Sequence, residues 1–311
     1  MSSARGASCH LPAVSVVMSV YNCERYVAEA VESILGQTFT DFEFIIIDDG
    51  STDRSLSILR RFAQRDGRIR LVSRGNRGLT RSLNEGLGLA RGEFIARMDA
   101  DDISLPERLE RQVEYLRAHP ECVALGCRLY LIDPDGDPLM EEPRPTTHED
   151  IMQMLLRGSG AIPHPGAMIR RTDLCAIGGY NEEFKAAQDL DLWLRLSERR
   201  QLANLDEVLV RYRMHFGSVS VGSRQVQVSF AERAVREARL RRGQTPERLP
   251  LALSPPRSRR DTPLEMQRRW AWMALGAGNV KTARKHARRV LMQAPWSKES
   301  WRVMLCALRG W

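Results

Sequence analysis

Short apolar runs alternate with amphipathic helical segments through the first hundred residues, and this alternation limits the fold more than any other feature. We predict four buried strands, at residues 14–18, 42–47, 69–72 and 94–98. The segments between them repeat apolar side chains at helical spacing, as residues 24–35 and 80–90 do. Strands that alternate with helices of this length indicate an α/β fold, Rossmann-like, with a mostly parallel central sheet and helices on both faces.

The fourth predicted strand leads into three carboxylates within four positions: Asp99, Asp101 and Asp102. Carboxylates this close repel one another unless a cation or several hydrogen-bond donors lie among them. Hard divalent cations prefer such oxygen ligands, and α/β sheets bind ligands at the carboxyl ends of their strands. The alternative is helix capping, because residues 104–107 form a capping-box sequence. Capping accounts for one acid but not for three, so we predict a metal site here.

The turn after the first strand, residues 19–23, contains no glycine. The glycine-rich fingerprint of dinucleotide-binding folds is therefore absent. The second strand, like the fourth, ends in acids, Asp48 and Asp49. A phosphate group bound beside so many carboxylates needs a cation between them. This combination favours a metal-bridged nucleotide diphosphate over a redox cofactor.

The net charge of +8 raises nucleic-acid binding as a hypothesis, because phosphate contacts need basic groups. The excess gathers after Arg224 rather than around aromatic side chains on a reading surface, so we expect no nucleic-acid partner. An anionic membrane surface or an anionic substrate would account for a basic tail equally well.

Targeting and cysteine patterns indicate a cytoplasmic protein. No stretch is apolar over the length that spans a bilayer, and residues 1–10 lack the apolar core of a signal peptide. The six cysteines show no C-x-x-C spacing, which favours reduced thiols and no zinc site. We therefore expect a cytoplasmic location, with peripheral contact at the inner membrane face through the basic tail as the alternative to a fully soluble state.

The C-terminal part differs from the rest of the chain. Residues 223–261 are basic and are predicted to form a helix and a linker. Residues 262–311 open with a capping box and contain amphipathic segments at about 263–276, 280–293 and 298–309, similar to a tetratricopeptide-like helical hairpin. Its tryptophan and leucine side chains are interpreted as core, with docking on a partner or a membrane surface as the alternative.

Four segments, in order, resemble family 2 glycosyltransferases of the GT-A fold: residues 16–22, 47–53, 99–102 and 188–193. The resemblance covers about residues 12–222. It implies one domain over 11–222, in which residues 11–105 form the nucleotide-sugar half and residues 106–222 the acceptor half. The Q-x-x-R-W signature and the membrane helices of processive synthases are not found, so the resemblance implies transfer of one sugar per encounter.

The implied reaction moves a sugar from a nucleotide-diphosphate sugar, most often a UDP-sugar, to a hydroxyl group of a glycan or a lipid-linked saccharide in cell-surface polysaccharide synthesis. The resemblance assigns the base and ribose to Ser19 and Tyr21, and the base imide hydrogen to Asp49. Ser19 stands where the family usually has proline. Asp101 would coordinate Mg²⁺ or Mn²⁺ between the two donor phosphates, and Asp99 would lie near the ribose or a metal-bound water.

Asp189 matches the catalytic base of the family motif, and one base with an in-line path implies inversion at the anomeric carbon. Gln188 stands where the family often has glutamate. The missing negative charge leaves open how far the pKa of Asp189 is raised. His215 is a candidate metal or phosphate ligand, and His164 is a weaker one; the alternative for each is a structural residue. Arg81 is a candidate donor contact, with simple surface solvation as the alternative.

Two other functions stay open at this point. A sugar nucleotidyltransferase would share the α/β half and the metal, but would need a Gly- and Arg-rich loop where residues 19–23 stand. A non-catalytic module that binds a nucleotide sugar would keep the nucleotide pocket without needing Asp189.

Overall fold

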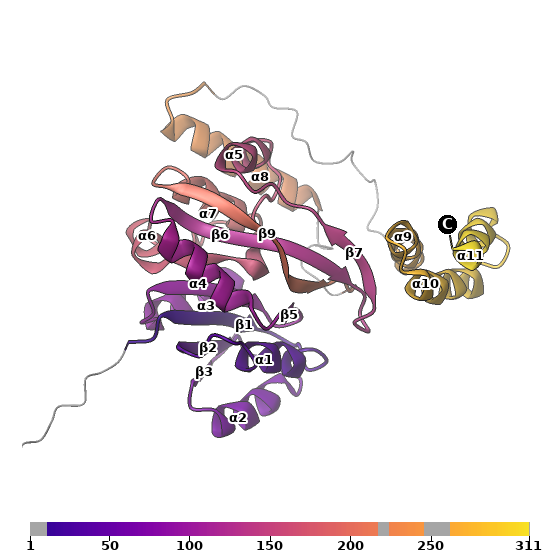
Figure 1. Cartoon of the computed structure of the whole chain (residues 1–311), viewed down its shortest axis with the longest axis horizontal. Helices are drawn as coiled ribbons and strands as arrows, with labels where there is room; N and C mark the ends of the chain where they lie inside the picture. The colour runs from indigo at the N-terminus through magenta and orange to yellow at the C-terminus, as the bar shows by residue number, and fades with distance from the viewer. Residues whose placement is uncertain (1–10, 217–223, 246–261, 311) are drawn as a thin grey trace, which may run out of the picture.

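The computed structural model describes residues 11–216, 224–245 and 262–310, and a nine-stranded mixed sheet forms its centre (Figure 1). The strands are β1 (Val14–Val20), β2 (Phe42–Asp48), β3 (Ile69–Ser73), β4 (Phe94–Asp99), β5 (Ile103–Ser104), β6 (Cys122–Ile132), β7 (Pro138–Glu142), β8 (Met168–Arg170) and β9 (Gln201–Arg213). Their order is β3-β2-β1-β4-β8-β6-β9-β5, with β7 paired to β6.

Helices connect and cover these strands. They are α1 (Val27–Leu35), α2 (Ser55–Arg65), α3 (Leu79–Leu89), α4 (Arg108–Ala118), α5 (His148–Leu156), the 3-10 turn η1 (His164–Gly166), α6 (Arg171–Ala176), α7 (Gln188–Leu196), α8 (Arg224–Arg241), α9 (Pro263–Gly276), α10 (Val280–Gln293) and α11 (Lys298–Arg309). None of the described helices is long and apolar enough to cross a membrane.

The first four strands are parallel and confirm the predicted centre of the sheet. In β1, Ser19 lies opposite Asp99 of β4, and Val20 lies opposite Asp48 of β2. Because parallel strands end at the same edge of a sheet, this register brings the acids after β2 and β4 to one edge. The two faces of β1 pack against different helices: Val16 belongs to the cluster with α1 and α4, and Val17 to the cluster with α3 and α7.

The second half of the sheet departs from the parallel pattern. Strand β8 runs antiparallel to both β4 and β6, and β5 pairs antiparallel with β9. The capping-box interpretation of residues 104–107 is wrong: Ser104 lies in β5 opposite Val210, and α4 begins at Arg108 without a side-chain cap. Pairing with β9 is a tertiary contact, which the local capping pattern does not register. The pairing of β5 with β9 therefore holds residues 99–102, which we call the acidic loop, between β4 and β5.

Three helices follow residue 261, as the amphipathic segments predict, while most of the predicted linker lies outside the described residues. Thr262 and Glu265 form the predicted capping box of α9. Helices α9 to α11 share an apolar cluster with β6, β7 and β9, which includes Trp270 of α9, Leu129 of β6 and Leu139 of β7. The C-terminal helices therefore lie beside β7 at one end of the sheet (Figure 1).

A buried ionic contact fastens these helices to the turn between β6 and β7. Asp133 is fully buried and accepts hydrogen bonds from His286 Nε2 at 2.8 Å and Lys285 Nζ at 2.5 Å, both on α10. Burial opposes ionisation of Asp133, but the bonds from His286 and Lys285 outweigh it and hold its pKa well below the ordinary value.

Replacing Asp133 by Asn is expected to lower the free energy of unfolding by about 3 kcal/mol, because it removes the anion beside the buried His286. Lys285 is partly exposed and keeps its pairs with Asp135 and Asp137. The lowered pKa makes the contribution of Asp133 present above the ordinary aspartate pKa and progressively lost as the pH falls below it. Urea unfolding at neutral and acidic pH, followed by circular dichroism, measures both effects. Asp206→Asn, at a side chain 74% exposed, is the control. An equally stable Asp133→Asn protein would contradict this role.

Candidate active site

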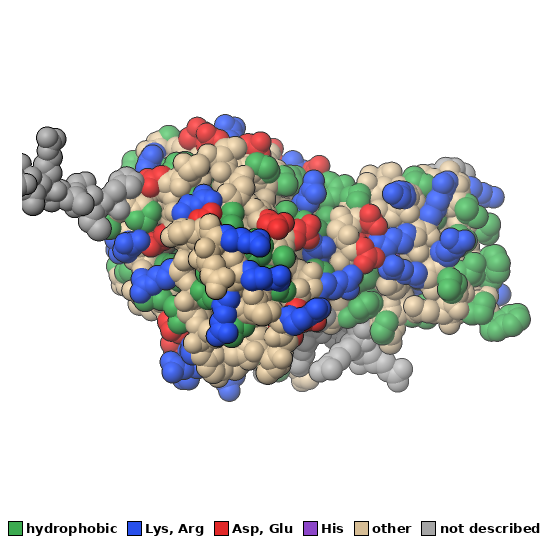
Figure 2. Space-filling view, turned by 90° about the horizontal axis from the view of Figure 1, so that it is seen from below, with side chains coloured by type: hydrophobic (Ala, Val, Ile, Leu, Met, Phe, Trp, Pro, Cys, Tyr) green, Lys and Arg blue, Asp and Glu red, His purple; other side chains and the backbone are tan. Residues whose placement is uncertain are grey.

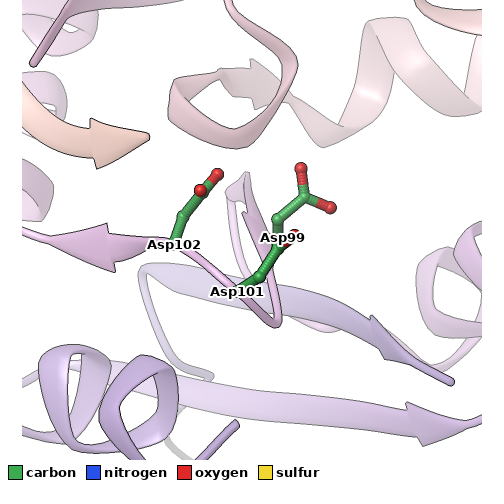
Figure 3. Close-up of side chains that lie close together, drawn as sticks. All are labelled: Asp99, Asp101 and Asp102. Atoms are coloured by element: carbon green, nitrogen blue, oxygen red, sulfur yellow. The ribbon is translucent and has the colours of Figure 1, made fainter. Parts of the chain in front are cut away.

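Three carboxylates meet at the end of β4. One oxygen from each of Asp99, Asp101 and Asp102 lies within 4.8 Å of the others. Figure 3 shows Asp99 and Asp102 pointing to the same side of the loop that joins β4 to β5. Strand β4 ends at Asp99 and β5 begins at Ile103, so the connecting loop is short. The short loop keeps the three side chains close together.

Asp102 is the buried member of this cluster. Its Oδ1 accepts a hydrogen bond from the Arg213 backbone N–H at 2.8 Å, whereas Oδ2 has no hydrogen-bond partner among the described residues. Burial, and then the charges of Asp101 and Asp99, raise the pKa of Asp102 well above its ordinary value. A buried carboxylate oxygen without a partner is costly. A divalent cation would supply the missing partner and reverse the repulsion, so these residues fit the predicted metal.

His215 lies beside Asp101, as the sequence-based assignment of both to one site requires. Its Nε2 is 2.8 Å from Asp101 Oδ2, and its ring is 5.2 Å from the ring of Tyr26. Arg213, two positions earlier, donates to the backbone oxygen of Asp101 at 2.8 Å. The end of β9 therefore supports the acidic loop through both backbone and side-chain contacts. No arginine side chain is paired with the Asp101 carboxylate among the described contacts, which leaves it available to an ion.

Arg97 is a residue of this site that the sequence analysis missed. Its side chain is buried and forms an ion pair with Asp99, and its Nε has no hydrogen-bond partner among the described residues. Burial raises the pKa of Asp99, and the Arg97 charge opposes that rise. The signal was present in the sequence: an arginine inside an otherwise apolar strand needs an anion nearby.

Asp189 lies in the first turn of α7, and its carboxylate is close enough to Asp99 and Arg97 to interact with their charges. The residue before the helix, Ala187, adopts a left-handed conformation with φ of 52°, which is unusual for a residue other than glycine. Burial raises the pKa of Asp189, and the charge of Arg97 is among the influences that lower it. The charge of Asp189 in turn contributes to the raised pKa of Asp99. A half-buried carboxylate with a raised pKa is suited to accept a proton.

Asp49 is held by the loop after β3. Its carboxylate pairs with Arg74 and accepts hydrogen bonds from the backbone N–H groups of Arg77 at 2.7 Å and Gly78 at 2.9 Å. Gly50 makes this approach possible, because its φ is +77° and a Cβ there would lie 2.6 Å from the Asn76 nitrogen. Asp49 thus fixes a loop in this structure, and its role toward a base stays a prediction.

The other candidate donor contacts lie at the surface or at the sheet edge. Tyr21 is exposed after β1, and Ser19 lies opposite Asp99 of the neighbouring strand β4. Arg81 is exposed, and its Nε lies 2.9 Å from Glu182. His164 is buried and bonds to the Tyr180 hydroxyl at 2.8 Å; burial lowers the pKa of His164, which favours the neutral, structural role.

Sequence comparison shows which known proteins this chain resembles. Residues 15–178 match the model of "Glycosyl transferase family 2". An uncharacterized glycosyltransferase of Haemophilus influenzae is 35% identical over 237 residues, covering 73% of each chain. The O-antigen biosynthesis glycosyltransferase WbnJ of Escherichia coli is 34% identical over 210 residues, covering 66% of this chain and 81% of that protein.

Structure comparison finds the same architecture in enzymes of low sequence identity. Residues 1–349 of TarS from Staphylococcus aureus, solved with UDP-GlcNAc, align with a TM-score of 0.57 at 18% identity and cover 96% of this chain and 88% of that one. The mannosyltransferase PcManGT from Pyrobaculum calidifontis, solved with GDP-Man and Mn²⁺, aligns with a TM-score of 0.55 at 18% identity and covers 97% and 86%.

Proposed function

Since this chain belongs to glycosyltransferase family 2 and has the GT-A fold, we propose that it is an inverting, metal-dependent enzyme that transfers a single sugar. The donor is a nucleotide-diphosphate sugar, of the UDP class. The acceptor is a hydroxyl group of a glycan or a lipid-linked saccharide in cell-surface polysaccharide synthesis, and the reaction takes place on the cytoplasmic side of the membrane. The observation that carries this proposal is the cluster of Asp99, Asp101 and Asp102 in one electrostatic environment with Asp189.

Several relatives support the assignment to cell-surface glycans. WbnJ acts in O-antigen biosynthesis, and a relative from Erwinia amylovora, 33% identical over 215 residues, is a glycosyltransferase of amylovoran biosynthesis. Among the structural neighbours, TarS was solved with UDP-GlcNAc and PcManGT with GDP-Man. Both donors carry a diphosphate but differ in their base. These structures therefore support a donor with a diphosphate more strongly than they support uracil as its base.

Asp101, with Asp99, Asp102 and His215 around it, would hold Mg²⁺ or Mn²⁺. When bound, the ion neutralises the charge that develops on the leaving nucleoside diphosphate. Arg97 limits the repulsion within the cluster by pairing with Asp99. Ser19, Tyr21 and Asp49 would bind the nucleoside, and Arg81 the diphosphate.

Asp189 would accept the proton of the acceptor hydroxyl as that oxygen attacks the anomeric carbon. Burial raises its pKa, which makes it a stronger base than an exposed aspartate. Attack from the side opposite the diphosphate, with one base and no covalent intermediate, inverts the configuration of the anomeric carbon.

The deciding experiment incubates the full chain with a panel of nucleotide sugars and Mn²⁺ and identifies the product released. A glycosyltransferase is expected to release the nucleoside diphosphate slowly by hydrolysis, faster for its own donor than for the others, and to stop when EDTA is added. A parallel incubation with nucleoside triphosphates and sugar 1-phosphates tests the alternative, because a nucleotidyltransferase would release pyrophosphate from that pair of substrates. Donor binding without any product would indicate a non-catalytic module.

A further inference from the structure

The last two helices carry an apolar surface that no described residue covers. Of the ten large apolar side chains exposed in the described chain, five lie between residues 292 and 308, and Trp296 is 96% exposed. We call these five the apolar face: Met292, Trp296, Trp301, Leu305 and Leu308. Clusters of this kind on soluble proteins mark sites of contact with a partner or a membrane.

The apolar face has a regular helical basis. Trp301, Leu305 and Leu308 follow one another at spacings of four and three residues, so they lie along one side of α11. The opposite side of the helix, at Val303 and Ala307, is buried in the cluster with α9 and α10. Helix α11 is therefore apolar on two sides, and only one of them is needed for its own packing.

Basic residues surround the apolar face. Residues 262–310 contain ten Lys and Arg against two Glu. Lys298 and Arg302 on α11 and Arg288 on α10 are all exposed. Green and blue side chains crowd the right-hand end of the molecule in Figure 2, where these helices lie.

We propose that the apolar face docks helices α10 and α11 on an anionic lipid bilayer. Tryptophan, leucine and methionine side chains would enter the boundary between headgroups and acyl chains, while lysine and arginine contact the anionic headgroups. The charge argues against a second copy of this chain as the occupant, because two such basic surfaces would repel.

Docking would hold the catalytic domain at the membrane. Helix α10 is fastened to the β6–β7 turn through His286 and Asp133, and Arg213 binds both that turn and the acidic loop. The domain would therefore be presented to the bilayer in a defined orientation. The benefit of such an orientation rests on the proposed function, because a lipid-linked acceptor lies in the membrane. Docking itself does not depend on the proposed function.

The test is sedimentation of the full chain with vesicles at low salt. Wild type is expected to sediment with vesicles of phosphatidylcholine mixed with phosphatidylglycerol and to stay in the supernatant with phosphatidylcholine alone. The double variant Trp296→Ala, Trp301→Ala is expected to lose binding by about tenfold or more, since apolar burial drives insertion. Lys298→Glu with Arg288→Glu should also weaken binding. In wild type, tryptophan emission should shift to the blue with anionic vesicles.

Two controls make the outcomes distinct. Val226→Ala with Leu240→Ala removes exposed apolar side chains of α8 and should bind like wild type. Donor hydrolysis in solution should be unchanged in every variant, so a failure of docking is separable from a failure of the proposed function. Equal binding to both kinds of vesicle, no binding to either, or dimerisation of wild type that the double variant abolishes without any vesicle binding would each overturn the proposal.

Discussion

Replacing Asp189 by Asn is expected to lower kcat by about 10²- to 10⁴-fold, the usual contribution of a general base, while the affinity for the donor changes little. Asparagine keeps the size of the side chain but cannot take up the acceptor proton. Product release by the variant, together with calorimetric titration of the donor, separates the two effects.

The control for this variant lies two residues further along α7. Asp191 is buried and pairs with Arg195 at 2.8 Å, so Asp191→Asn should reduce stability but leave kcat almost unchanged at low temperature. If instead Asp191→Asn abolished turnover and Asp189→Asn did not, the assignment of the base would be wrong.

The rate should also depend on pH in a direction that the structure sets. Burial raises the pKa of Asp189, and the base must be ionised to act. We therefore expect kcat to fall as the pH is lowered, with a midpoint above the ordinary aspartate pKa of about 3.9. A rate profile measured on the wild type tests this, and a midpoint at or below the ordinary value would contradict the burial argument.

Replacing Asp101 by Asn is expected to remove most of the activation by Mn²⁺ and to lower kcat by about 10²- to 10³-fold, the range for losing one electrostatic contact to a developing charge. Asp101 has His215 beside it rather than a paired arginine side chain, so it is the member of the acidic cluster best placed to donate to an ion. Activity measured across Mn²⁺ concentrations shows the loss as a weaker and shallower activation curve.

Thermal unfolding provides a second measurement of the same site without turnover. Mn²⁺ bound to the native state raises Tm, corresponding to about 2.7 kcal/mol at 100 times the dissociation constant. Because burial and its neighbours raise the pKa of Asp102, protons compete with the ion, and the shift should be larger at neutral than at acidic pH. Asp101→Asn should lose the shift, while Asp206→Asn should retain it. An unchanged shift in Asp101→Asn would place the ion elsewhere.

Much of the fold was predictable because its signals are local. The period of the apolar residues located α9, α10 and α11 within a residue of their observed bounds, and four apolar runs located the parallel strands. The acidic cluster was also predictable from the sequence, because carboxylates that are adjacent in sequence remain adjacent in space. Local patterns failed where a distant strand took part: Ser104 pairs with β9 instead of capping a helix.

The sequence by itself determined the alternation of strands and helices, the three acids after β4 and the motif around Asp189, because each depends on residues close together in the chain. Only the tertiary structure decided that Arg97 pairs with Asp99, that one oxygen of Asp102 is buried without a partner, and that Asp189 lies within electrostatic reach of these groups. The physical reason is that packing of the whole sheet, rather than any local periodicity, sets the distances between segments far apart in sequence.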